Sequence, residues 1–218
     1  MPKLVPIVEG DGEVMAVPVL LYKLLHAMNR YDLQVAPPKN AHGRHNLQKP
    51  NGLEKFVKHA WKERECGAIV ILLDAEEECP VDVIKDFFKR VTALGVLHPV
   101  VIVCAKRMYE TWLLASSETI GLPIESTLAK DPESVKNPKR LFNEHFPPGR
   151  IYKETEDQVA MTNKLDTALA KERSRSFRRL CHALEQAIEA LDNGAKIVTP
   201  SLAEPPASIS KRGKRRKS

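Results

Sequence analysis

Three short apolar runs constrain the fold of this chain more than any other feature. Residues 4–8, 68–73 and 99–104 are almost continuously apolar, and each run is followed by polar or charged residues. Continuous runs of this length are typical of strands that are covered on both faces of a sheet. The segments between the runs carry apolar residues at helical spacing. Strands that alternate with helices predict an α/β fold with a mainly parallel sheet flanked by helices.

The same patterns predict the remaining elements. An apolar stripe from Val17 to Met28 predicts a helix, and Pro18 fits that helix only in its first turn, because proline removes a backbone donor. We also expect a strand over 31–35, a long polar loop over 38–52 and a proline-rich irregular segment over 120–150. Further helices are expected over 53–65, 81–94, 108–116, 157–171 and 176–191.

Composition divides the chain into three expected parts. Residues 1–118 form the α/β core, residues 119–192 form an irregular segment with C-terminal helices packed on it, and residues 193–218 form a disordered basic tail. Six of the seven residues from Lys211 to Lys217 are Lys or Arg, and outside this run the basic and acidic residues balance. The tail therefore either clamps a phosphate backbone or serves as a solubilising terminus.

Several protein classes are disfavoured. No run reaches the roughly 18–20 apolar residues of a membrane span, and a strand-like segment follows Met1 directly, so we expect neither a membrane anchor nor a secretory signal. The four cysteines form no C-x-x-C pair, and the histidines near His42 have no matching partners for a zinc site. These features predict a cytoplasmic protein with reduced thiols.

Acidic residues follow the first two strong strands. Glu9 comes directly after the first, and Asp74 and Glu76 come after the second. Ligands of parallel sheets collect outside the carboxyl ends of the strands, so these carboxylates are expected to converge there. Oxygen ligands of this kind suit Mg²⁺, which works on phosphodiesters in many enzymes. The alternative for each acid alone is that it caps the following helix.

Several segments together resemble a known family. The segments are Val8–Glu13, Leu73–Pro80, Ala105–Ala115, Pro138–Lys139, Tyr152 and Ser174–Leu180. In this order they resemble the Toprim-type proteins of the domain of unknown function 4276, over most of the chain to about residue 192. The Toprim fold, a Rossmannoid α/β fold, is shared by topoisomerases, bacterial primases and the nucleases of the overcoming-lysogenization-defect group.

The resemblance implies roles for individual residues. Glu9 matches a glutamate that is a metal ligand or a general acid/base, and Asp74 and Glu76 match a D-x-D pair whose second aspartate is replaced here. Glu77 and Glu78 either compensate for that replacement or begin a solvated helix. Glu13 either serves a second metal, as in nuclease-type sites, or complements the helix dipole.

Basic residues supply candidates for nucleic-acid contacts. Arg107 and Glu110 follow the third strong strand. Arg107 either holds a phosphate or forms an ion pair with Glu110. Glu110 is either a further metal ligand or the partner of Arg107. Arg44 and Lys49 lie in the predicted polar loop, and Arg178 and Arg179 lie in a basic helical stretch. Each either contacts nucleic acid or belongs to a solvated surface. Trp112 is expected to pack in the core.

The function predicted from these features is metal-dependent hydrolysis of DNA or RNA with Mg²⁺ or Mn²⁺. The resemblance implies a place in bacterial anti-phage defence beside a partner ATPase of the ABC or SMC-like type, since the chain itself has no P-loop motif. Whether the chain forms a homo-oligomer is left open. The alternative function is a catalytically degenerate Toprim module that acts as an interaction or sensor subunit, which the replacement at Glu76 favours.

Overall fold

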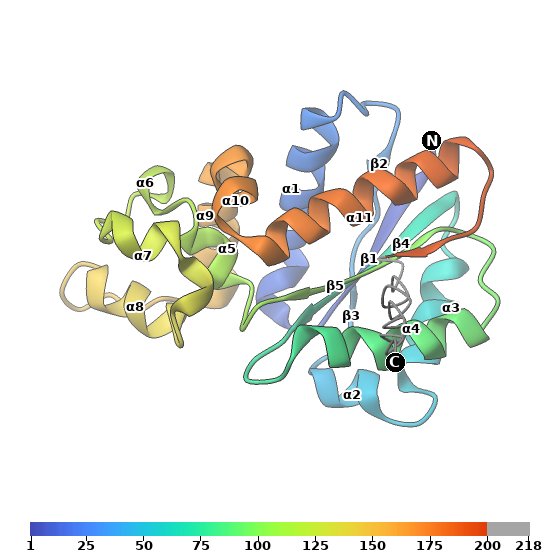
Figure 1. The fold of residues 1–218 in the computed structure, drawn as a ribbon, viewed down its shortest axis with the longest axis horizontal. Coiled ribbons are helices and arrows are strands. Elements are labelled where there is room, and N and C mark those ends of the chain that lie inside the picture. The colour runs from blue at the N-terminus through green and yellow to red at the C-terminus, as the bar shows by residue number, and fades with distance from the viewer. Residues whose placement is uncertain (200–218) are drawn as a thin grey trace, which may run out of the picture.

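The computed structural model describes residues 1–199, which form a parallel sheet between two layers of helices (Figure 1). The strand order is β2-β1-β4-β5-β6, and β3 also pairs with β1. Every strand pairing in the described range is parallel, which confirms the predicted fold class. The strands are β1 (Lys3–Val8), β2 (Gln34–Val35), β3 (Lys39–Asn40), β4 (Cys66–Asp74), β5 (Val100–Ala105) and β6 (Val198–Thr199).

Helices cover both faces of the sheet. Residues of β4 alternate between two apolar clusters, with Val70 and Leu72 on one face and Ile69 and Ile71 on the other. The long helices α1 (Asp11–Ala27) and α11 (Arg175–Asp192) pack on the first face, and α3 (Gly52–Trp61) and α4 (Pro80–Ala93) pack on the second (Figure 1). This two-sided burial explains why the strand sequences are continuously apolar rather than alternating.

Two expectations for the first fifty residues are corrected by the structure. Helix α1 begins at Asp11, so Pro18 lies in its middle and not in its first turn. Interrupting a helix with proline costs about 3 kcal/mol, but each fully buried leucine contributes about 1.5–3 kcal/mol, and α1 buries four of them. The segment 38–52 is not simply a loop, because it contains β3 and the short helix α2 (Arg44–Gln48).

A group of short helices lies to one side of the sheet (Figure 1). It consists of α5 (Glu110–Leu114), α6 (Ser117–Ile120), α7 (Ser126–Lys130), the 3-10 turn Pro132–Ser134, α8 (Pro138–His145), the π-helical turn Glu154–Gln158, α9 (Val159–Lys164) and α10 (Thr167–Arg173). The segment 120–150 is therefore more helical than expected. The single helix expected over 157–171 is broken at Asp166, whose carboxylate accepts hydrogen bonds from the backbone of Ala168 and Leu169 and starts a new helix.

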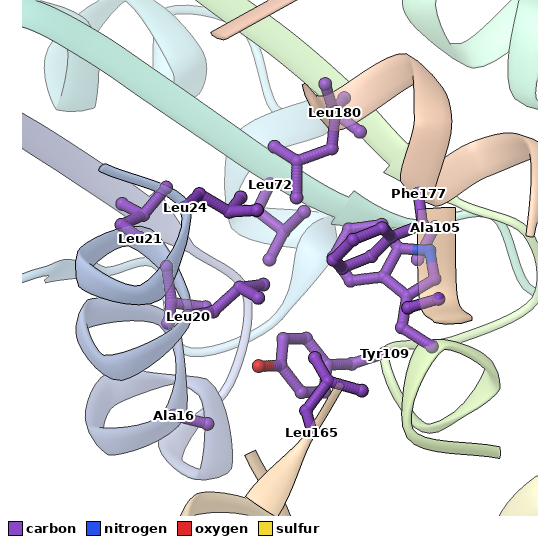
Figure 2. Packing of buried hydrophobic residues seen from close by; sticks show 14 of the residues in the cluster. Ala16, Leu20, Leu21, Leu24, Leu72, Ala105, Tyr109, Leu165, Phe177 and Leu180 are labelled. Atoms are coloured by element: carbon purple, nitrogen blue, oxygen red, sulfur yellow. The ribbon is translucent and has the colours of Figure 1, made fainter. Parts of the chain in front are cut away.

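The larger apolar cluster joins these short helices to the sheet. Leu20, Leu24, Leu72, Tyr109 and Phe177 gather in it, although they come from distant parts of the chain (Figure 2). Trp112 is fully buried, as expected, with its ring centroid 5.5 Å from that of Phe177. Its indole N–H donates to Ser176 Oγ at 2.9 Å, so the buried polar group is satisfied.

The C-terminal end of the described range extends the sheet. The composition predicts a disordered tail from residue 193 onward, but Val198–Thr199 form β6 and pair with β5. The basic run from Lys211 to Lys217 lies outside the described residues, so that prediction stays open. Within residues 1–199, the helices lack the combination of length and apolar character that crossing a membrane requires.

Candidate functional site

The connections of β1 place a crevice at the carboxyl end of the sheet. The chain leaves β1 through α1 on one face and returns to β2 and β3 on one side of β1. It then crosses through α2 and α3 on the opposite face to β4, on the other side of β1. Helices that leave in opposite directions open a crevice beyond the strand ends, which is where ligands bind in folds of this type. The crevice lies where β1 and β4 end.

Glu9 and Asp74 meet at this crevice. Glu9 follows the last residue of β1, and its Oε1 accepts a hydrogen bond from the backbone N–H of Asp74 at 3.1 Å. Asp74 ends β4, and its Oδ1 is buried without a hydrogen-bond partner in the described part of the chain. A buried carboxylate oxygen without a hydrogen-bond partner costs folding free energy, so Asp74 Oδ1 calls for a partner that this chain does not provide within residues 1–199.

Glu13 and Glu110 bring two further carboxylates to the crevice. Glu13 lies in the first turn of α1, and its Oε2 accepts from the backbone N–H groups of Glu9 and Gly10 at 2.8 and 3.1 Å. Glu110 begins α5 and is fully buried; its Oε1 accepts from the Tyr152 hydroxyl at 2.8 Å and from Gln158 Nε2 at 3.1 Å. Its Oε2 has no hydrogen-bond partner among the described residues.

Burial and mutual repulsion make these carboxylates poor acids. Burial is the main cause that raises the pKa of Glu9 to about 7 and the pKa of Glu13 to about 8. Burial, reinforced by the charges of Glu13, Glu110 and Glu9, raises the pKa of Asp74 well above its usual value. Several carboxylates held in one poorly solvated place favour their neutral forms, or a cation that neutralises them.

A cavity of about 660 Å³ opens at the cluster. The four carboxylates line it together with Glu76, Glu78, Arg44, Lys139, Gln158 and residues of the loops that follow β1 and β3. Lys139 Nζ is 2.7 Å from Glu154 and 3.9 Å from Glu110. Burial lowers the pKa of Lys139, but Glu110 and Glu154 more than offset this effect, so the pKa rises and the side chain stays cationic.

The turn after β4 holds the second half of the predicted D-x-D pair. Glu76 is exposed, has a left-handed backbone (φ 49°) and lines the cavity, and its N–H donates to the Arg107 carbonyl at 2.7 Å. Arg107 also has a positive φ, of 67°, and its guanidinium lies 3.1 Å from Glu77 rather than against Glu110. Left-handed conformations of residues other than glycine cost about 1–3 kcal/mol and cluster at functional sites.

The four residues predicted to contact nucleic acid fall in different places. Arg44 lines the cavity. Lys49 is exposed just beyond α2, where its Nζ donates to Asn46 at 2.9 Å. Arg178 and Arg179 lie in the first half of α11, away from the residues that line the cavity, and Arg178 donates to the Lys171 carbonyl.

Lys139, Gln158 and Glu154 were not among the predicted site residues. They come from the segment after residue 118, where short helices leave no long periodic pattern to interpret. Pro138–Lys139 and Tyr152 did contribute to the family resemblance, which was the only available signal for this side of the cavity.

Comparison with known protein families identifies the family of this chain. The sequence profile of the family described as domain of unknown function (DUF4276) matches residues 8–185. The chain belongs to the DUF4276 family.

Solved structures similar to this DUF4276 chain include two C-terminal regions of OLD proteins. That of Burkholderia pseudomallei has 16% sequence identity and a TM-score of 0.44, over 88% of this chain and 99% of the other. That of Xanthomonas campestris pv. campestris has 15% identity and a TM-score of 0.41, over 87% of this chain and 97% of the other. A search of curated proteins found no match.

The cavity of this DUF4276 chain has the donor chemistry for a hard divalent cation. Two carboxylate oxygens, Asp74 Oδ1 and Glu110 Oε2, are buried and have no hydrogen-bond partner among residues 1–199, and both residues line the cavity. Oxygen donors of this kind are those that Mg²⁺ and Mn²⁺ prefer. Within residues 1–199, no three His, Cys, Asp or Glu side chains stand close enough together to hold a metal ion as they lie. The residues fit a divalent cation in the chemistry of their donor atoms.

Proposed function

We propose that this protein hydrolyses phosphodiester bonds of nucleic acid with Mg²⁺ or Mn²⁺ bound in the carboxylate cavity. The observation that carries the proposal is the convergence of Glu9, Glu13, Asp74 and Glu110 on one cavity at the carboxyl ends of β1 and β4. Two of their buried oxygens have no hydrogen-bond partner within the described range 1–199. Such an arrangement is unfavourable unless protons or a cation neutralise it, because like charges repel strongly in a poorly solvated site.

The proposed ligands are Glu9, Asp74 and Glu110, with Glu13 and Glu76 as further members of the set. A divalent cation held there would polarise the scissile phosphate and lower the pKa of an attacking water. Tyr152 and Gln158 fix Glu110 by binding its Oε1, which leaves its Oε2 for the cavity.

Cationic side chains at the cavity and beside it would contact the substrate phosphates: Lys139 lines the cavity, and Arg107 lies next to the turn that carries Glu76 without lining it. Lys139 is cationic and lines the cavity on the side of Glu110. Arg107 would bind a phosphate by exchanging its exposed partner Glu77 for phosphate oxygens, a bidentate geometry that guanidinium favours. Lys49, Arg178 and Arg179 remain proposed contacts for more distant parts of the strand.

The wider context follows from the family resemblance and is part of the proposal. It comprises a role in bacterial anti-phage defence, a partner ATPase of the ABC or SMC-like type, and a cytoplasmic location. The sequence contains no P-loop motif, so any ATP-driven step would come from the partner.

The test is a cleavage assay with matched variants. Purified protein is incubated with supercoiled plasmid, single-stranded DNA and a structured RNA, in Mg²⁺, Mn²⁺ or EDTA. We expect metal-dependent cleavage that is lost in Asp74→Asn and retained in Asp82→Asn, which removes an exposed carboxylate of α4. Equal cleavage by wild type and Asp74→Asn would contradict the proposed site, because a contaminating nuclease would then explain the activity.

A second candidate function is a catalytically degenerate interaction module. The observation that favours it is the turn that carries Glu76, which is exposed and does not bring its carboxylate into a ready ligand set. This candidate predicts no cleavage of any of the three substrates by the wild type, whichever metal is added. Restoration of cleavage by Glu76→Asp would show that the degenerate residue alone had silenced the site.

A further inference from the structure

Arg44 is a buried cation in the wall of the carboxylate cavity. Only 9% of the residue is exposed. Its Nη1 donates to the backbone carbonyl of Asp74 at 3.1 Å, and its Nη2 lies 3.0 Å from Glu78 Oε1. The guanidinium therefore contacts both ends of the turn 74–78, in which Asp74 and Glu76 lie. A planar guanidinium suits this task, because it presents several donors in fixed directions.

The backbone beside Arg44 is tied to the other acidic strand end. Gly43 donates its N–H to the carbonyl of Glu9 at 2.7 Å, with φ at 108°. Such a positive φ is open to glycine and strained for other residues. Residues 43 and 44 thus bind the end of β1 through one contact and the turn after β4 through two, so they span the crevice between the two strands.

We propose that Arg44 is a positioning residue that sets the spacing of Glu9 and Asp74 and thereby the affinity of the cavity for a divalent cation. The proposal rests on the proposed function, because it assumes that these carboxylates bind the cation. It gives Arg44 an inward role in place of the contact with nucleic acid that the sequence predicts. Two of its three nitrogens are held by the chain itself, while its Nε has no hydrogen-bond partner among residues 1–199. With only 9% of the residue exposed, the two contacts suit a fixed structural role more than exchange with an incoming phosphate.

The positioning role and simple electrostatics predict opposite changes in cation affinity when Arg44 is neutralised. A positive charge beside a cation site repels the cation, so neutralising Arg44 without any movement should tighten cation binding. If Arg44 instead holds the turn in place, its loss lets Asp74 and Glu76 move away from Glu9, and cation binding weakens. The sign of the change separates the two accounts.

The experiment measures Mn²⁺ binding directly, without nucleic acid. Binding is followed by the electron paramagnetic resonance signal of free Mn²⁺ under argon at pH 8.5. Wild type is compared with Arg44→Gln, with Arg44→Lys, and with Arg90→Gln, a control that removes a partly buried arginine from its ion pair with Glu54 on the α3–α4 side. The melting temperature of each variant is recorded without metal.

We expect Arg44→Gln to weaken Mn²⁺ binding about tenfold and Arg44→Lys to weaken it about threefold, because an ammonium group keeps the charge but not the two-ended contact. Arg90→Gln should lower the melting temperature and leave the Mn²⁺ affinity unchanged. Unchanged or tighter binding by Arg44→Gln would overturn the positioning role while leaving the proposed function intact. If Arg44→Gln does not fold, Arg44→Lys decides: an affinity equal to that of wild type overturns the proposal. Absence of Mn²⁺ binding by wild type would overturn both.

Discussion

The backbone N–H of Asp74 donates a hydrogen bond to the carboxylate of Glu9, across the gap between β1 and β4. The bond uses the main chain of Asp74 and orients the Glu9 carboxylate, while Asp74 Oδ1 stays buried without a hydrogen-bond partner in the part of the chain that the structure describes. Two acidic side chains 65 residues apart in the chain are thus placed side by side with one of them unsatisfied. The arrangement costs folding free energy, because a buried polar atom that is not satisfied loses its hydration without compensation.

Replacing Asp74 by asparagine should stabilise the metal-free protein. The variant keeps the backbone bond to Glu9 but removes a carboxyl group whose ionisation the folded state disfavours, so we expect the free energy of unfolding at pH 8 to rise by about 1–2 kcal/mol. Mn²⁺, which should raise the melting temperature of wild type, should have little effect on the variant. Urea unfolding with and without Mn²⁺ measures both. A variant less stable than wild type at pH 8 would show that Asp74 is not strained by its neighbours.

The stability of the metal-free protein should fall as pH rises from about 5 to 8. The folded state holds protons on Glu9 and Glu13 up to pKa values of about 7 and 8, whereas the unfolded chain releases them near pH 4.5. The folded state therefore binds more protons within this window, and stability decreases with pH by at most about 1.4 kcal/mol per unit for each such proton.

The variant Glu13→Gln isolates one of these groups. The stability of this variant should decline less steeply between pH 5 and pH 8 than that of wild type, because glutamine carries no titratable proton and the contribution of Glu13 to the slope disappears. Urea unfolding at half-unit intervals of pH gives the two slopes. Parallel curves would mean that Glu13 titrates near its usual pKa in the folded protein.

Gly12 should resist substitution because α1 approaches the π-helical turn closely. A Cβ at this position would lie 2.8 Å from Gln158 Oε1 and 2.9 Å from Glu154 Cβ. We expect Gly12→Ala to cost about 1–3 kcal/mol of stability through this overpacking. Gly10→Ala is the matched control two residues earlier, at the N-cap of α1, since nothing lies within 4 Å of a Cβ built there. Equal thermal stability of the two variants would argue against this close contact.

Phe177 should anchor α11 to the sheet and to the short helices. It is fully buried beside Trp112 in the larger apolar cluster, so Phe177→Ala should cost about 3–5 kcal/mol. Tyr31→Ala removes an aromatic ring that is 64% exposed and should change stability by less than about 0.5 kcal/mol. Chemical denaturation at pH 7 provides the comparison. Similar losses of unfolding free energy in both variants would contradict the anchoring role of Phe177.

Much of the fold was predictable because its signals are local. A continuous apolar run such as 68–73 encodes a strand buried on both faces, and the helical stripes between such runs encode the crossovers. Parallel strands end at one edge, so acids that follow them, such as Glu9 and Asp74, could be expected to meet there. The interruption of the helix at Asp166 and the strand β6 were not predicted, because a single capping side chain or a two-residue strand leaves little pattern in the sequence.

The sequence by itself determined the parallel α/β architecture, the acidic strand ends and the family. Only the tertiary structure decided that Glu110 faces the same cavity, that Lys139 and Gln158 complete it, and that Arg44 is turned inward. The physical reason is that burial and periodicity are properties of neighbouring residues. The direction of a side chain across a cavity depends instead on how segments that are distant in the chain pack, and on which buried polar atoms they leave unsatisfied.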